Sequence, residues 1–138
     1  MTARKANPNQ PLYRLFLRNH FSILAETLAR QAEKGEGNNH RDIAAAIAEM
    51  LKLKADSADD FYRAAALLTR CVPLAQKDAG LADDQRKALA DKYAADAVGH
   101  LREAVKRGLP DTEPIKTSAA FNPLRNRDDF KKLVAELK

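Results

Sequence analysis

Apolar side chains recur at three- and four-residue steps along every long segment of this 138-residue chain. Such spacing places them on one face of an α-helix. The repeated positions are Leu17, Phe21, Leu24, Leu28 and Ala32; Ile43, Ala44, Ile47, Ala48 and Leu51; Phe61, Ala65, Leu68 and Val72; and Leu89, Tyr93, Ala97, Leu101 and Ala104. No segment shows the alternation of a half-buried strand. The pattern therefore predicts an all-α protein with four long helices.

Residue types that favour helix ends divide these segments. The predicted boundaries are Pro11 in the first turn of the first helix, a cap at Asn39 with Asp42 three residues on, a capping box of Ser57 with Asp60, a start at Asp83 or Asp84, and an end at Gly108. Pro73 interrupts the third helix and predicts a kink, after which the chain continues through Leu74 and Ala75. We expect two antiparallel helical hairpins, residues 11–54 and 57–107.

The segment after Gly108 has a different composition. Pro110, Pro114 and Pro123 argue against regular structure, yet Ile115 and Phe121 are apolar enough to pack. Residues 108–124 are therefore predicted to form an ordered loop that lies on the bundle.

A last helix is predicted over residues 126–138, with Asn126 as its cap and Asp129 three residues on. Its apolar positions are Phe130, Leu133, Val134 and Leu137. This helix should dock on the bundle as a cap, with Arg125, Arg127 and Asp128 making fold-back and capping contacts.

Length and charge set the domain organisation. Residues 11–138 are enough for one helical domain. Residues 1–10 are predicted to be a flexible basic arm, and no acid precedes Glu26 in a chain of formal net charge +5.

No apolar run approaches the roughly 18 residues of a membrane span, and the N-terminus lacks the pattern of a secretory signal. These features and a single cysteine, Cys71, favour a cytoplasmic protein without an internal disulfide.

The residues predict no catalytic, cofactor or metal site. His20, His40 and His100 are the histidines, and none is followed four residues later by a second ligand. Cys71 follows Arg70, which would lower a thiol pKa, but its place on an apolar helix favours a buried, inert thiol. We expect a chain that is not itself an enzyme.

Four arginines share helix faces in pairs. Arg14 and Arg18 are one turn apart, and Arg63 and Arg70 are two turns apart. They could line a cationic groove for an acidic or phosphorylated peptide. The alternative is that they pair with local acids such as Asp59, Asp60 and Glu26, and this alternative is favoured.

The hairpins resemble degenerate tetratricopeptide repeats, in which stacked helix pairs bury their faces against one another. The match lies in large and small residues at family spacing: Phe21, Leu24, Ala25 and Leu28; Ala44, Ala48 and Leu51; Tyr62, Ala65, Ala66 and Thr69; and Ala97, Leu101 and Ala104. In such proteins the first helix of each pair lines the concave surface where partners bind.

Three blocks carry a more specific resemblance: Pro11 to His20, Phe61 to Ala75, and Phe121 to Phe130. In this order they look like the C-terminal, tetratricopeptide-like region of planctomycete-type bacterial proteins, which include eukaryotic-like serine/threonine protein kinases and WD-repeat proteins. The chain departs from the family by the insertion Glu36 to Asn39, where the family has a shorter turn.

The resemblance implies an interaction module attached to, or derived from, a signalling kinase. The glycine-rich loop, the paired lysine and the catalytic aspartate of a kinase are not in this sequence. The alternative function is binding of a polyanion or nucleic acid through the basic N-terminal region. The aromatic residues lie in helical stripes, and no helix-turn-helix signature is clear, so protein binding is favoured.

Overall fold

The computed structural model describes residues 11–35, 39–53 and 58–137, with side chains from Leu17 onward. Its described part is helical and contains no strand, so the predicted all-α class is confirmed. The elements are α1 (Pro11–Glu33), α2 (His40–Lys52), α3 (Ala58–Gln76), α4 (Asp83–Lys106), α5 (Glu113–Thr117), the 3-10 helix η1 (Ala119–Leu124) and α6 (Asp128–Glu136).

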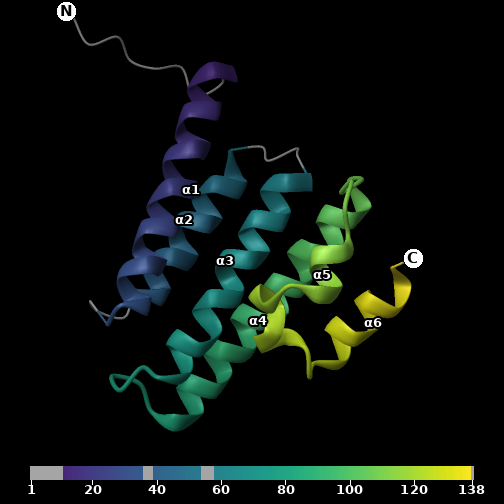
Figure 1. The fold of residues 1–138 in the computed structure, drawn as a ribbon. Helices are drawn as coiled ribbons and strands as arrows, with labels where there is room; N and C mark the ends of the chain where they lie inside the picture. The colour runs from purple at the N-terminus through teal and green to yellow at the C-terminus, as the bar shows by residue number, and fades with distance from the viewer. Residues whose placement is uncertain (1–10, 36–38, 54–57, 138) are drawn as a thin grey trace, which may run out of the picture.

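The four long helices follow one another across the molecule and alternate in direction (Figure 1). α1 packs chiefly on α2, and α3 packs chiefly on α4, while α3 also contacts α1, α2 and η1. α1 and α6 lie at opposite edges of the molecule (Figure 1). No described helix has both the length and the apolar character needed to cross a bilayer.

Several predicted boundaries are confirmed. α1 begins at Pro11, α4 begins at Asp83, and α3 continues through Pro73 to Gln76. α4 ends just before Gly108, whose φ of 88° lies in the left-handed region where a side chain is strained. Asn39 does occupy the cap position of α2, but its side chain makes no capping hydrogen bond. The Ser57 capping box lies outside the described residues.

The predicted cap of the last helix is wrong by one residue. Arg127, not Asn126, precedes α6 with extended backbone. Its guanidinium binds both carboxylate oxygens of Asp129 at 3.0 Å and also donates to Asp91 of α4. This bidentate pair raises the pKa of Arg127 and lowers that of Asp129. The ion pairs, rather than an asparagine side chain, hold the start of α6 against α4.

The predicted irregular loop 108–124 contains two short helices, α5 and η1. Pro114 is compatible with α5 because it lies in the first turn, where a backbone N–H has no intrahelical partner. The Ser118 hydroxyl accepts a hydrogen bond from Ala120 N and so caps η1. Arg125 donates to the carbonyls of Lys116 and Ser118, which ties the end of η1 back to α5.

The end of the chain contributes large side chains to the core, as predicted for Ile115 and Phe121. Both are fully buried, together with Leu124. The Phe121 ring packs edge-to-face on Tyr62 of α3 at 5.6 Å between centroids and lies 6.5 Å from Phe130 of α6. The segment after Gly108 is therefore part of the core.

The buried face of α2 is rotated from its predicted position. Ala48 was expected inside and is exposed, whereas Ala46 and Met50 are buried with Ile43 and Ile47. The cause is that α2 contacts both α1 and α3, so its buried stripe faces the space between two helices.

We predict that Phe121→Ala lowers the free energy of unfolding by about 3–5 kcal/mol, because it removes a fully buried ring and leaves a cavity. Urea denaturation followed by circular dichroism measures the loss. Val134→Ala, at a half-buried position of α6, is the control and should lower the free energy of unfolding clearly less. Equal losses in the two variants would contradict a core built on Phe121.

Candidate functional site

The arginines predicted to form a groove lie along the contact between α1 and α3, where each described one has a polar neighbour. Arg18 Nη1 lies 3.3 Å from Asp60 Oδ2, a buried oxygen that accepts no well-formed hydrogen bond. Arg63 Nη1 donates to the buried Ser22 Oγ at 3.0 Å. The side chain of Arg14 lies outside the described residues.

Arg70 is the most fully paired of the set. It donates to both oxygens of Glu33 at 2.5 and 3.0 Å and to Glu26 Oε2 at 3.0 Å. The hydrogen bonds to Arg70 lower the pKa of Glu33, and the pairing raises the pKa of Arg70. Arg18 and Arg70 thus pair with local acids, as the alternative interpretation expected.

Arg63 differs from these two arginines. It is exposed, and among the described residues its bonding partner is a hydroxyl rather than a carboxylate. It borders a surface pocket of about 380 Å³ whose other lining residues are Ser22, Ile23, Glu26, Thr27 and Arg30 of α1. We call this the α1–α3 groove. Ile23 is 67% exposed there, an unusual position for a large apolar side chain.

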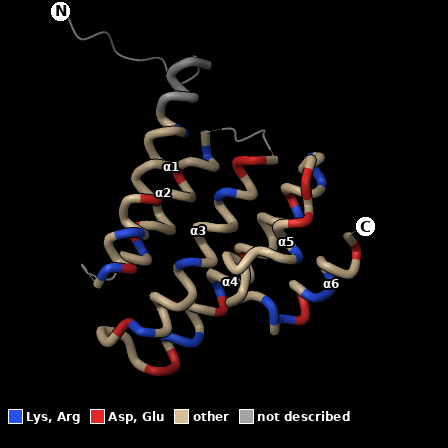
Figure 2. Tube along the Cα trace, in the orientation of Figure 1, with Lys and Arg blue, Asp and Glu red and all other residues tan. Residues whose placement is uncertain are grey.

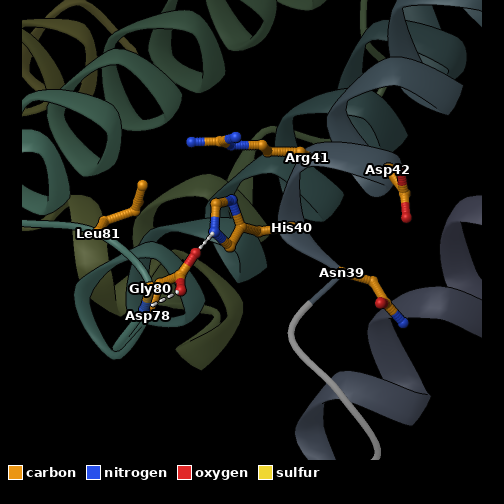
Figure 3. Close-up of a pocket in the computed structure, with 7 residues that line it drawn as sticks. All are labelled: Asn39, His40, Arg41, Asp42, Asp78, Gly80 and Leu81. Atoms are coloured by element: carbon orange, nitrogen blue, oxygen red, sulfur yellow. Dashed lines mark hydrogen bonds and ion pairs between the residues drawn. The ribbon is translucent and has the colours of Figure 1, made fainter.

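A second polar cluster joins the start of α2 to the α3–α4 turn and to α4. The His40 ring is 1% exposed. Its Nδ1 lies 2.8 Å from Tyr93 Oη, and its Nε2 lies 2.8 Å from Asp78 Oδ2. Figure 3 shows His40 and Asp78 pointing toward each other at the edge of a pocket of about 390 Å³, with Arg41 on the far side of the ring.

The donor and acceptor capacities of the three side chains indicate where the protons of this cluster lie. The Asp78 carboxylate accepts, so Nε2 carries a proton and donates; in the neutral ring, Nδ1 then accepts from the Tyr93 hydroxyl. The bond from His40, together with the Gly80 N–H that donates to Asp78 Oδ1, lowers the pKa of Asp78. Arg86 donates to the carbonyls of Asp78 and Leu81, which fixes the rest of the turn.

This cluster positions helices and is poorly suited to nucleophilic chemistry. Burial raises the pKa of Tyr93 to about 12 and that of the neighbouring Cys71 thiol to about 12, so both stay protonated near neutral pH. Both ring nitrogens of His40 already have partners inside the protein. The expectation of an unreactive, buried Cys71 agrees with its burial.

The sequence interpretation missed the His40 cluster, because its members stand 38 and 53 positions from His40 along the chain. No spacing rule connects them. His40 was considered only as a metal ligand, and the one local signal, Asp78 two residues before Gly80, is typical of any turn.

Burial lowers the pKa of His100, whose ring lies 6.1 Å from that of Phe61, and His20 lies on the exposed side of α1. Within the described ranges, no group of three or more His, Cys, Asp or Glu side chains could hold a metal ion.

Comparison of the chain with protein-family models, with curated proteins and with solved structures finds no match.

We predict that Asp78→Asn lowers the free energy of unfolding at pH 7. The difference in this free energy between the variant and the parent should become smaller as the pH falls below about 4. Since folding lowers the pKa of Asp78, its contribution is present above the ordinary carboxyl pKa and is lost as the pH drops through the lowered value. Urea unfolding at pH 7, 5, 4 and 3.5 measures it.

Asp84→Asn, at an exposed position in the first turn of α4, is the matched control and should leave the stability at pH 7 nearly unchanged. If the loss of stability caused by Asp78→Asn stays constant down to pH 3.5, the ionised carboxylate does not stabilise the fold.

We also predict that Cys71 reacts with a thiol reagent far more slowly in the folded protein than in urea, because burial both covers the sulfur and raises its pKa to about 12. Absorbance after addition of a disulfide reagent at pH 8 follows the reaction. Labelling of the native protein at the rate of a free thiol peptide would show that Cys71 is accessible and activated.

Proposed function

We propose that this chain is a non-catalytic protein–protein interaction module of tetratricopeptide-like architecture, which binds an acidic or phosphorylated protein segment in the α1–α3 groove. The observation that carries the proposal is an exposed arginine without a described carboxylate partner, Arg63, beside the exposed apolar Ile23. A cation next to an apolar contact recognises a segment that offers a negative group and an apolar side chain.

The polar groups around this pair support the same class of ligand. Arg30 lines the groove and lies 3.4 Å from Glu26 in an exposed pair. Such pairs contribute little to stability, so Arg30 can exchange Glu26 for a carboxylate or phosphate of the partner. Thr27 adds a hydroxyl to the lining.

The arrangement of helices adds a second line of support. α1 and α3 are the first helices of the two predicted hairpins, and these are the helices that line the concave binding surface in stacked-repeat proteins. By the resemblance of its three sequence blocks, we propose that the module is attached to, or derived from, a bacterial serine/threonine protein kinase. Reading the coding sequence upstream of Met1 tests that context.

Charge distribution favours a protein partner over a polyanion. Lysines, arginines and acids are interspersed along the described helices (Figure 2). The described arginines Arg18, Arg70 and Arg127 are held by acids of the same chain. The basic residues that favoured polyanion binding are Arg4, Lys5, Arg14 and Arg18. The first three have side chains outside the described part of the chain, and Arg18 lies beside Asp60.

We predict that Arg63→Glu weakens binding of peptides selected from an acidic and phosphoserine peptide library by about tenfold or more, since hydrogen bonds to charged groups contribute about 1.5–3 kcal/mol. Fluorescence anisotropy measures the affinity. Lys131→Glu makes the same change of charge at an exposed position of α6 and should leave binding unchanged. Equal affinities for the parent and Arg63→Glu would exclude this groove.

Titration with heparin at two salt concentrations examines the alternative. Strongly salt-dependent binding to heparin that survives Arg63→Glu would favour polyanion binding by the N-terminal region. Absence of salt-dependent heparin binding would exclude polyanion binding as the function.

A further inference from the structure

α1 carries a second groove, on its side toward α2, which is separate from the α1–α3 groove. It has a volume of about 330 Å³. Its lining residues are Phe21, Leu24 and Leu28 of α1 and Asp42, Ala45, Ala46 and Glu49 of α2. These positions recur at three, four or seven residues in each helix, so each set forms one face. We call this surface the α1–α2 groove.

The floor of the α1–α2 groove is apolar and partly open. Leu24 is 39% exposed, Ala45 is exposed, and Phe21 and Leu28 are half-buried. In the described structure, Ile23 and Leu24 are the two exposed large apolar side chains. They are consecutive, and consecutive helical residues point about 100° apart, which is why Ile23 faces one groove and Leu24 the other.

The charge of the α1–α2 groove is opposite to that of the chain. Asp42 and Glu49 are its charged lining residues, and no lysine or arginine whose side chain the structure describes lines it, although the net charge is +5. Asp42 pairs with no cation of the described residues, and Glu49 makes only an exposed pair with Lys52 at 3.2 Å. Both carboxylates are therefore open to a partner's cations at little cost.

The two carboxylates also have a helical separation. They stand seven residues apart in α2, which is about two turns or roughly 10 Å. Basic residues seven positions apart on a helix docked alongside would match that separation. An apolar stripe on the same helix, at i, i+3 or i+4 and i+7, would lie on Leu24, Phe21 and Leu28, as in recognition of amphipathic helices by grooves.

We propose that the α1–α2 groove docks a cationic amphipathic helix of a partner protein, with apolar residues against Leu24 and lysines or arginines beside Asp42 and Glu49. This surface is distinct in place and in charge preference from the α1–α3 groove. The chain thereby has two sites on opposite sides of α1, one for an acidic segment and one for a basic helix.

The test uses a model peptide that forms an amphipathic helix of leucines and lysines, with a leucine and glutamate peptide of the same pattern as its control. Isothermal titration calorimetry should show saturable binding of the lysine peptide and none of the glutamate peptide. Leu24→Lys should weaken that binding by about tenfold, because it removes the apolar anchor and adds repulsion. Ile23→Lys, the same change at the adjacent residue, should leave it nearly unchanged.

Charge is tested separately. Asp42→Asn combined with Glu49→Gln should weaken binding and reduce its dependence on salt. Asp84→Asn combined with Glu136→Gln makes the same change of charge elsewhere and should do neither. Circular dichroism checks that each variant is folded. Equal effects of Leu24→Lys and Ile23→Lys, or equal effects of the two charge-neutral pairs, would overturn the proposal.

Two further outcomes would also overturn it. Tight binding of the glutamate peptide would show that the groove is merely apolar. A dimer of the parent that Leu24→Lys converts to monomer would show that the groove is a self-association surface. Peptides selected for the α1–α3 groove should bind Leu24→Lys normally, so failure of one site is distinguishable from failure of the other.

Discussion

The packing of α3 in the middle of the bundle is the constraint on which the rest of the structure depends. α3 contacts α1, α2, α4 and η1, and a helix with that many neighbours must be apolar on most of its circumference. Three of its alanines, Ala64, Ala65 and Ala75, are fully buried. Small side chains let the neighbouring helices approach closely, so the positions of the other helices follow from the surface that α3 offers them.

Polar groups then fix the positions that apolar packing leaves adjustable. Burial of an unpaired charge is costly, so ionic groups at the helix contacts are stabilised by specific partners. Arg70 holds α3 to α1, Arg127 holds the start of α6 to α4, and His40 links α2 to the α3–α4 turn and α4. These contacts leave Arg63 and Ile23 exposed at the α1–α3 groove and Leu24 exposed at the α1–α2 groove, the two surfaces that we propose as binding sites.

How far the sequence alone predicted the fold varied with the kind of interaction. Helix class and the ends at Pro11, Asp83 and Gly108 were predictable, because helical period and end preferences act within a few residues. The rotation of α2, seen in exposed Ala48, was not, because it depends on two helices distant in sequence. Likewise α5 and η1 were missed, since each gains most of its stability from packing residues such as Phe121 into the core.

The sequence by itself determined that this chain forms helices, since helical spacing and side-chain chemistry act locally; which face of each helix is buried depended on its neighbours, as the exposed Leu24 and Ala48 show. The tertiary structure alone decided how its charges are used. Four arginines looked equivalent in the sequence, yet the fold places Arg18 and Arg70 beside acids and Arg63 beside a serine. It also brought His40, Asp78 and Tyr93 together. Pairing between distant residues depends on where helices pack, and no local pattern carries that information.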